Sequence, residues 1–176
     1  LNCRGLSDQA KAKNTIKAFQ NLYKRSKVTH NITLLQETHL FNESFLAKTL
    51  DCQIIAAHGN RQSRGVAVVL SNGPRIIPNS IRKDPDGRYI ILALSEYNPG
   101  KPKSPLVITN IYAPNDHKSS MEFFKTVAEE IDDLCFELAV TDAYEQPELV
   151  IAGDFNFVST GSENSLNRQI TPTEAA

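Results

Sequence analysis

Polar side chains that could bind a metal ion or a phosphate stand directly after short apolar runs of the sequence. Glu37 and Tyr112 each follow one such run, and Asp154 and Asn156 follow a third. In open α/β sheets ligands bind beyond the ends of strands, so carboxylates at converging strand ends would form a site for a hard cation. Mg²⁺ takes oxygen ligands, often one or two carboxylates together with water and substrate phosphate. Asp154 and Asn156 are two residues apart, so their side chains share one face if strand geometry continues through them.

Each of these residues also has a simpler interpretation. Glu37 could be a solvated turn residue, and Tyr112 could be an aromatic residue that closes the core at the end of a strand. The segment from Gly153 to Asn156 could be a turn, because Gly, Asp and Asn are common turn residues. Singly these signals are weak, and it is their occurrence together and in this order that favours a site.

The elements that must position these residues follow from hydrophobic periodicity. Apolar residues spaced three and four apart predict a helix over residues 10–25, in which Ala12 and Ile16 share one face. A longer stripe predicts a second helix that begins with a Ser119–Glu122 capping box, and its members are Met121, Phe124, Val127, Ile131, Leu134 and Leu138. A short helix is expected near 43–50, and strands are expected at 32–35, 53–57, 66–70, 89–94, 106–112 and 149–152. Helices lie between more numerous strands, which predicts an α/β protein with helices packed on sheets.

Composition narrows the class of protein. The 176 residues suffice for one domain with a hydrophobic core. Because 19 basic and 20 acidic residues leave a net charge of −1, DNA binding would need a local basic face and a metal ion. Three separated cysteines without a Cys-x-x-Cys pair predict neither disulfides nor zinc, and favour a reducing nuclear or cytoplasmic location. No apolar run reaches the ~18 residues of a membrane span. The chain lacks both an initiator Met and a signal peptide, and we expect it to be a fragment.

Five motifs carry a family resemblance from residue 1 to about residue 168. They are Leu1-Asn2-Cys3-Arg4-Gly5-Leu6, Leu35-Gln36-Glu37-Thr38-His39, Gly65-Val66-Ala67-Val68, Asn110-Ile111-Tyr112-Ala113-Pro114-Asn115 and Gly153-Asp154-Phe155-Asn156. In this order they resemble the endonuclease/exonuclease/phosphatase superfamily. Three stretches, Gln36–Leu40, Asp86–Ile90 and Asn110–Asn115, are most similar to the apurinic-type endonuclease of non-LTR (LINE-class) retrotransposons, which nicks target DNA to prime reverse transcription.

This resemblance implies a fold and a domain organisation. The implied fold is a two-sheet α/β sandwich of the DNase I type, with helices on the outer faces and incomplete at the C-terminus. Residues 1–158 would form a partial domain, and the polar segment 159–176 would lead into the missing part. The family completes its site with a downstream Asp and a Ser-Asp-His segment, which this sequence lacks. We therefore expect the chain alone to be weakly active or inactive, and poorly stable.

The resemblance also implies roles for the residues of this sequence that match the family's motifs. Glu37 would be the main protein ligand of Mg²⁺, for which Mn²⁺ can substitute, and Asn2 would orient the phosphate and the metal-bound cluster. Tyr112 would donate a hydrogen bond to the scissile phosphate. Asp154 would orient or activate the attacking water, and Asn156 would hold the phosphate and the transition state.

The resemblance further implies the partners of the protein. Asn115 and Arg168 are similar to DNA-contacting positions, and the implied partners are double-stranded DNA and a reverse-transcriptase domain in the same polyprotein, with no membrane. Two alternatives remain open at this point. The chain could be another phosphodiesterase of the superfamily, such as an abasic-site repair nuclease or a phospholipid or inositol phosphatase. It could also be a degenerate, non-catalytic remnant.

Overall fold

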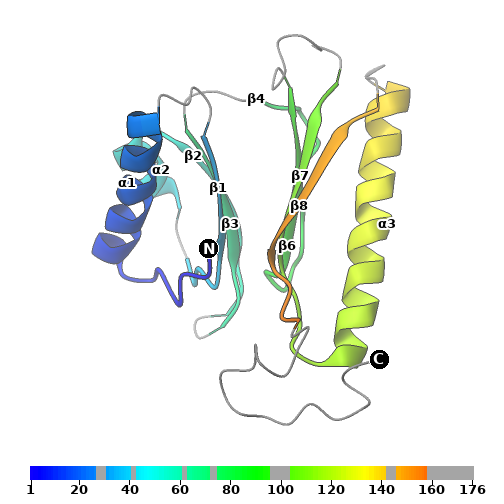
Figure 1. Ribbon diagram of the computed structural model, residues 1–176, viewed down its shortest axis with the longest axis horizontal. Coiled ribbons are helices and arrows are strands. Elements are labelled where there is room, and N and C mark those ends of the chain that lie inside the picture. The colour runs from blue at the N-terminus through cyan, green and yellow to red at the C-terminus, as the bar shows by residue number, and fades with distance from the viewer. Residues whose placement is uncertain are drawn as a thin grey trace.

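The structure is a computed structural model that describes residues 1–26, 31–40, 43–60, 63–71, 75–95, 104–141 and 146–157. Its elements form four layers in the order helices, sheet, sheet, helix (Figure 1). The elements are α1 (Gln9–Ser26), β1 (Asn31–Gln36), α2 (Ser44–Leu50), β2 (Gln53–Ala57), β3 (Val66–Ser71), β4 (Arg75–Ile76), β5 (Arg82–Lys83), β6 (Tyr89–Ser95), β7 (Leu106–Tyr112), α3 (His117–Thr141) and β8 (Glu148–Asp154).

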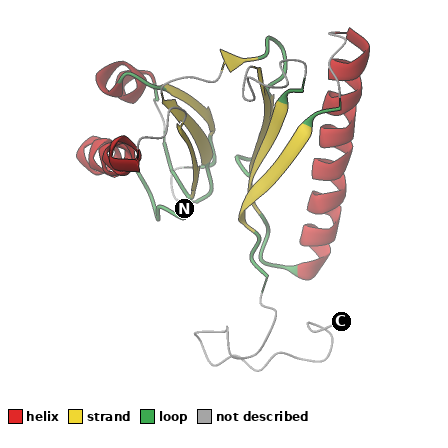
Figure 2. Ribbon diagram, turned by 45° about the horizontal axis from the view of Figure 1, so that its top comes forward, coloured by secondary structure: helices red, strands yellow, loops and turns green. Residues whose placement is uncertain are grey.

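The first sheet is antiparallel, with strand order β1-β3-β2. Helices α1 and α2 cover its outer face, as the turned view in Figure 2 also shows. Side chains alternate across a strand, so Ala67 and Val69 of β3 pack against Ala12 and Ile16 of α1 in one apolar cluster. The predicted amphipathic helix over 10–25 is confirmed.

The second sheet has the order β4-β6-β7-β8, and β5 pairs with β6. Strands β7 and β8 are parallel, so the chain crosses over through α3 between them. Helix α3 lies along the outer face of this sheet (Figure 1). Ile131 and Leu134 of α3 are buried against Val107 and Ile111 of β7. This crossover brings the carboxyl ends of β7 and β8 to the same end of the sheet.

The inner faces of the two sheets pack on each other and form the central layer. Val66, Val68 and Leu70 of β3 meet Ile90 and Leu92 of β6 there. Strand β6 is buried on both faces, which explains why it reads as a continuous apolar run rather than an alternating one. The predicted two-sheet α/β sandwich with helices on its outer faces is thus confirmed.

Two details of the predicted long helix are wrong. Met121 is 65% exposed, so it lies outside the stripe that faces the sheet. The helix begins earlier than the proposed capping box, at His117, and Asp116 caps it by accepting a hydrogen bond of 2.8 Å from the Ser119 backbone N–H to Oδ1. An Asp before the first turn satisfies an amide that has no partner within the helix, so Ser119 is not needed as the cap.

Strand β8 lies at the edge of the described sheet. It pairs with β7 on one side, and no described strand pairs with its other side. Leu149, Val150 and Ile151 are 47%, 45% and 44% exposed, which is high for a strand of this apolar character. The division at residue 158 stays a prediction because residues 158–176 lie outside the described part. None of the described helices has the length and apolar character needed to cross a membrane.

Candidate active site

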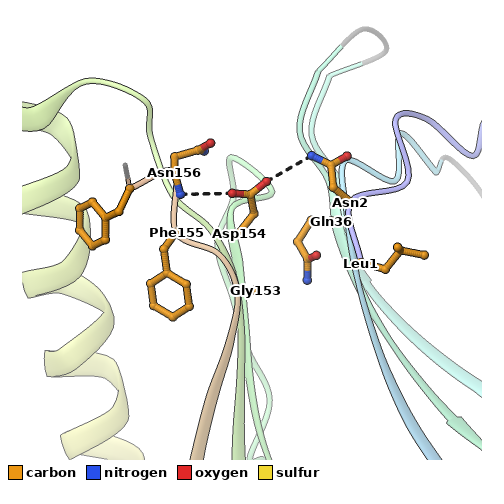
Figure 3. Close-up of a pocket in the computed structure, with 8 residues that line it drawn as sticks. Leu1, Asn2, Gln36, Gly153, Asp154, Phe155 and Asn156 are labelled. Atoms are coloured by element: carbon orange, nitrogen blue, oxygen red, sulfur yellow. Dashed lines mark hydrogen bonds between the residues drawn. The ribbon is translucent and has the colours of Figure 1, made fainter. Parts of the chain in front are cut away.

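The end of the sandwich where β1, β7 and β8 finish contains a polar pocket of about 420 Å³. Register places Tyr112 of β7 directly beside Asp154 of β8. Asn2 forms an isolated bridge with Gln36, the last residue of β1, and so joins the same end from the other sheet. The residues that line the pocket, most of which Figure 3 labels, are Leu1, Asn2, Gln36, Gly153, Asp154, Phe155, Asn156 and Phe157.

Glu37 leaves β1 in a left-handed conformation, with φ of 51°. Residues other than glycine adopt this region uncommonly, and they persist there when the surroundings fix them. Here the Glu37 carbonyl accepts a hydrogen bond of 2.7 Å from the Gly5 N–H, and the next residue, Thr38, donates 2.9 Å to the Gly65 carbonyl. The backbone of the N-terminal segment and of the loop before β3 therefore fixes the direction of the Glu37 side chain.

Tyr112 connects the two sheets at this point. Its hydroxyl donates a hydrogen bond of 2.7 Å to Glu37 Oε1. Burial, followed by the hydrogen bond and charge of Glu37 and by the charge of Asp154, raises the pKa of Tyr112 to about 12, although the Arg88 guanidinium opposes the shift. The Arg88 side chain lies over the ring, with its central carbon 5.8 Å from the centroid. Tyr112 is consequently a neutral hydrogen-bond donor at physiological pH.

The Asp154 carboxylate is held on both oxygens. Asn2 Nδ2 donates 3.2 Å to Oδ2, and the Asn156 backbone N–H donates 3.1 Å to Oδ1, as the dashed lines in Figure 3 show. The Asn2 side chain is fixed in turn because its Oδ1 accepts 3.1 Å from the Arg4 N–H. Asp154 thus has a defined orientation while remaining partly exposed.

Asn156 does not continue the strand, which corrects the expectation that its side chain shares a face with Asp154 through strand geometry. Strand β8 ends at Asp154, and Asn156 has φ of 52°. The bond from the Asn156 N–H to the Asp154 side chain is the local turn that Asp favours. Asn156 Nδ2 donates 2.6 Å to the Ala113 carbonyl, so the turn is attached to the end of β7.

Gly153 is required by the close approach of β8 to β7. Its φ is 150°, and a Cβ on it would lie 2.0 Å from the carbonyl oxygen of Ile111. Only a residue without a side chain fits at that distance. The glycine of the Gly-Asp-Phe-Asn motif therefore sets the position of Asp154 relative to Tyr112.

The remaining predicted residues lie differently. Asn115 is exposed in the loop between β7 and α3, whereas Arg168 lies outside the described residues. Asp116 lies in the loop after β7 and His117 is the first residue of α3, and hydrogen bonds from Ser119 lower the pKa of Asp116. The structure thus brings together Asn2, Glu37, Tyr112, Asp154 and Asn156 at one end of the sandwich.

Sequence reasoning missed part of the surroundings of this site. Phe155 and Phe157, which follow Asp154, stack on Phe124 of α3 with ring centroids 6.1 and 5.4 Å apart. Gln36 lines the pocket although it was read only as part of a motif. The signal that could have found Gln36 is a polar residue at an inward position of an apolar strand.

The donor atoms of the site fit a hard cation. No group of three or more His, Cys, Asp or Glu side chains gathers in the described ranges. Two carboxylates, Glu37 and Asp154, both raise the pKa of Tyr112, so both charges lie near its hydroxyl. Together with the amide oxygens of Asn2 and Asn156 they offer only oxygen ligands. Oxygen ligands suit Mg²⁺, whereas structural zinc prefers nitrogen and sulfur ligands.

Comparison with known proteins agrees with this fold. Residues 1–172 match the model of the Endonuclease/Exonuclease/phosphatase family. The chain therefore belongs to this family.

Similar solved structures include a 3′ phosphatase, NExo, from Neisseria bound to product DNA hairpin, at a TM-score of 0.54 and 22% identity over 82% of this chain and 54% of that one. TDP2 from Caenorhabditis elegans matches at a TM-score of 0.53 and 14% identity, over 86% of this chain and 44% of that one. ANGEL2, a 2′,3′-cyclic phosphatase, matches at 0.52 and 16%, over 78% and 42%. The chain thus spans about half the length of these structures.

Proposed function

We propose that the protein is a magnesium-dependent phosphodiesterase that nicks DNA, in the manner of the endonucleases of non-LTR retrotransposons. The observation that carries this proposal is the convergence of Asn2, Glu37, Tyr112 and Asp154 at one end of the sandwich, through two hydrogen bonds between the sheets. A second support is the identity of these residues, which are hydrogen-bond donors and carboxylates of the kinds that phosphodiester hydrolysis uses.

Glu37 would be the main ligand of the cation, with the amide oxygens of Asn2 and Asn156 nearby. A bound Mg²⁺, or Mn²⁺ in its place, offsets negative charge on the phosphate and on the leaving 3′ oxygen. Glu37 is partly buried and its backbone is fixed, so little reorganisation is needed for it to act as a ligand.

Tyr112 would donate its hydroxyl proton in a hydrogen bond to a non-bridging oxygen of the scissile phosphate. Its raised pKa of about 12 keeps the hydroxyl protonated across the physiological range. In this structure the same proton is donated to Glu37. A substrate oxygen that replaces the carboxylate as acceptor would therefore find a donor that is already positioned, and preorganised donors of this kind stabilise developing charge.

Asp154 would accept a proton from the attacking water. The water oxygen forms its new bond to phosphorus while the bond from phosphorus to the 3′ oxygen breaks, and the 3′ oxygen leaves with a proton from solvent. Hydrogen bonds from Asn2 and from the Asn156 backbone fix both carboxylate oxygens of Asp154. A positioned carboxylate base contributes roughly 10²–10⁴-fold to such a reaction, and the side chain of Asn156 would hold the phosphate beside it.

DNA is the substrate that the motifs favour. The stretches that flank Glu37 and Tyr112 resemble retrotransposon endonucleases, and the similar NExo structure is bound to product DNA hairpin. Asn115, exposed just beyond Tyr112, would contact the DNA beside the scissile phosphate. Arg168 would add a phosphate contact, and a reverse-transcriptase domain in the same polyprotein would use the nicked end.

A nicking assay tests this proposal. This chain, and the protein from the longest open reading frame that contains it, are incubated with supercoiled plasmid in Mg²⁺, in Mn²⁺ or in EDTA. We expect the longer protein to produce nicked circles with either metal and none in EDTA. Cleavage confined to an abasic-site duplex would indicate a repair nuclease instead, and phosphate release from an inositol phosphate would indicate a phosphatase. No hydrolysis of any substrate would favour a non-catalytic remnant.

A further inference from the structure

A pair of buried amide side chains joins the two sheets directly beneath the site. Gln36 of β1 is 2% exposed and Asn110 of β7 is 0% exposed. Gln36 Nε2 donates a hydrogen bond of 2.6 Å to Asn110 Oδ1. Asn110 Nδ2 donates 3.1 Å to the Leu35 carbonyl and 3.0 Å to the Ala67 carbonyl. We call Gln36 and Asn110 the amide clamp; it connects β7 to both β1 and β3.

The amide clamp occupies positions where apolar side chains are expected. The inner face of β1 otherwise presents Ile32 and Leu34 to the central layer, and that of β7 presents Leu106 and Ile108. Gln36 and Asn110 continue these two series with the period of two that a strand imposes. Burying an amide costs free energy unless its polar atoms find partners, and here the three hydrogen bonds supply partners for Gln36 Nε2 and for both Oδ1 and Nδ2 of Asn110.

The amide clamp lies next to the inter-sheet contact of the site. Gln36 immediately precedes Glu37, and Asn110 stands two residues before Tyr112, on the same face of β7. The hydrogen bond from Tyr112 to Glu37 therefore joins the same two strands as the amide clamp does, next to it along the strands. A shift of β7 against β1 would separate both pairs together.

We propose that Gln36 and Asn110 are positioning residues, which fix the register of the two sheets and thereby hold Glu37 and Tyr112 in contact. Their importance for catalysis rests on the proposed function, whereas their effect on the Glu37–Tyr112 contact does not. Apolar packing is non-directional and tolerates small displacements. Directional hydrogen bonds between buried groups select one arrangement, as buried polar residues do when they set the register of paired helices.

The test uses a double variant, Gln36→Met with Asn110→Leu. Replacing Gln36 alone takes the hydrogen-bond donor from the buried Asn110 Oδ1, and replacing Asn110 alone takes the acceptor from Gln36 Nε2, so either single change is destabilising. The double variant removes both amides and retains side chains of similar size, so we expect it to fold with a melting temperature close to that of the parent. The matched control is Thr109→Val, since Thr109 is also 0% exposed, neighbours Asn110 and has a hydroxyl without a hydrogen-bond partner among the described residues.

Two measurements are made on each folded protein. The first is the nuclear Overhauser effect between the Tyr112 ring and the Glu37 side chain in the metal-free chain. We expect it to be present in the parent and in Thr109→Val, and lost in the double variant. The second is the affinity for Mn²⁺, read from the free-ion electron paramagnetic resonance signal. We expect a decrease of roughly 10- to 100-fold in the double variant, as for other residues that orient metal ligands.

The two measurements separate the two proposals. A folded double variant that keeps the Tyr112–Glu37 signal at parental strength would overturn the positioning role, whatever its affinity for Mn²⁺. A parent chain that shows the signal but binds no Mn²⁺ would argue against the proposed cation site, and the signal in the double variant would still decide the role of the amide clamp.

Discussion

Asn2 and Asp154 are separated by 152 positions in the sequence and are joined by a hydrogen bond of 3.2 Å from Nδ2 to Oδ2. The bond crosses from the segment that pairs with β1 to the end of β8, and so it links the two sheets. Because Asn2 orients the carboxylate, its removal should affect the reaction more than the fold.

We expect Asn2→Ala to lower the rate of magnesium-dependent nicking by roughly 10²–10³, the usual effect of removing one preorganised hydrogen-bond donor. Asn2 is exposed, so its loss should barely change the melting temperature. Plasmid nicking rates and thermal unfolding check both parts. Asn14→Ala, which removes an exposed amide on α1, is the control and should nick at the parental rate. Equal nicking rates for Asn2→Ala and Asn14→Ala would contradict a role of Asn2 in the reaction.

The pKa of Tyr112 gives a second prediction. Burial and then Glu37 raise it to about 12 from an ordinary value of 10. Glu37→Gln removes the charge but leaves the burial, so the Tyr112 pKa should fall and still remain above 10. Titration of carbon-13-labelled tyrosine rings by NMR measures this, with Tyr112→Phe identifying the signal. A Tyr112 pKa that does not change in Glu37→Gln would contradict the hydrogen bond between them.

The same shift predicts a pH dependence of stability. Tyrosine is neutral when protonated, and its pKa is raised on folding, so the unfolded chain ionises first as pH rises. The stabilisation linked to Tyr112 is therefore complete below pH 10 and is lost as pH rises towards about 12. Urea unfolding between pH 9 and pH 12 should show a smaller loss of stability in Tyr112→Phe than in the parent. Parallel losses in both proteins would show that Tyr112 does not carry this linkage.

Gly153 should tolerate no side chain. A Cβ there would lie 2.0 Å from a backbone carbonyl oxygen, which can move away only if β8 separates from β7. Gly153→Ala should lower the free energy of unfolding by roughly 1–3 kcal/mol, the usual cost of overpacking, and should displace Asp154. The neighbouring change Ala152→Gly affects only backbone entropy and should cost about 0.5–1 kcal/mol. Urea denaturation measures the free energy of unfolding of both variants, and the loss should be larger in Gly153→Ala than in Ala152→Gly.

Asn156 should respond differently to Ala and to Gly. It adopts φ of 52°, and its side chain donates to the Ala113 carbonyl. Asn156→Ala loses the hydrogen bond and must hold alanine in the left-handed region, at a cost of roughly 1–2 kcal/mol. Asn156→Gly loses the same bond without that steric cost. Glycine should therefore be the milder change in chemical denaturation, and the reverse order would indicate that Asn156 is not in this turn.

Much of the fold could be predicted from local pattern. The bounds of β2 and β7 match the expected runs 53–57 and 106–112, because buried strands of this length read as continuous apolar segments. The two-residue strands β4 and β5 were not predicted, since so short a pairing depends on the neighbouring strand β6 and has no period of its own. Met121 was placed in the apolar stripe of α3, yet it points away from the sheet, and the polar Ser120 occupies the buried position beside it.

The residues of the site could be predicted from the sequence, but the contacts between them could not. Ordered motifs identified Glu37, Tyr112 and Asp154, but their contacts depend on the register between two sheets, which no local pattern encodes. The turn at Asn156 was considered only as an alternative to a site, whereas the structure shows the turn within the site itself. Gln36 and Asn110 were identified only as members of sequence motifs. Their hydrogen bond depends on how the two sheets pack, which the sequence does not reveal.

The measurement that tests the central claim most directly compares nicking by the parent and by Asp154→Ala, in the longest protein that contains this chain. We predict that Asp154→Ala nicks supercoiled plasmid in Mg²⁺ at least about 10²-fold more slowly, as expected for loss of a general base. The control is Asp133→Ala, which removes an exposed carboxylate from α3 and should nick at the parental rate. Nicking by Asp154→Ala at the rate of the parent would contradict the account of this site.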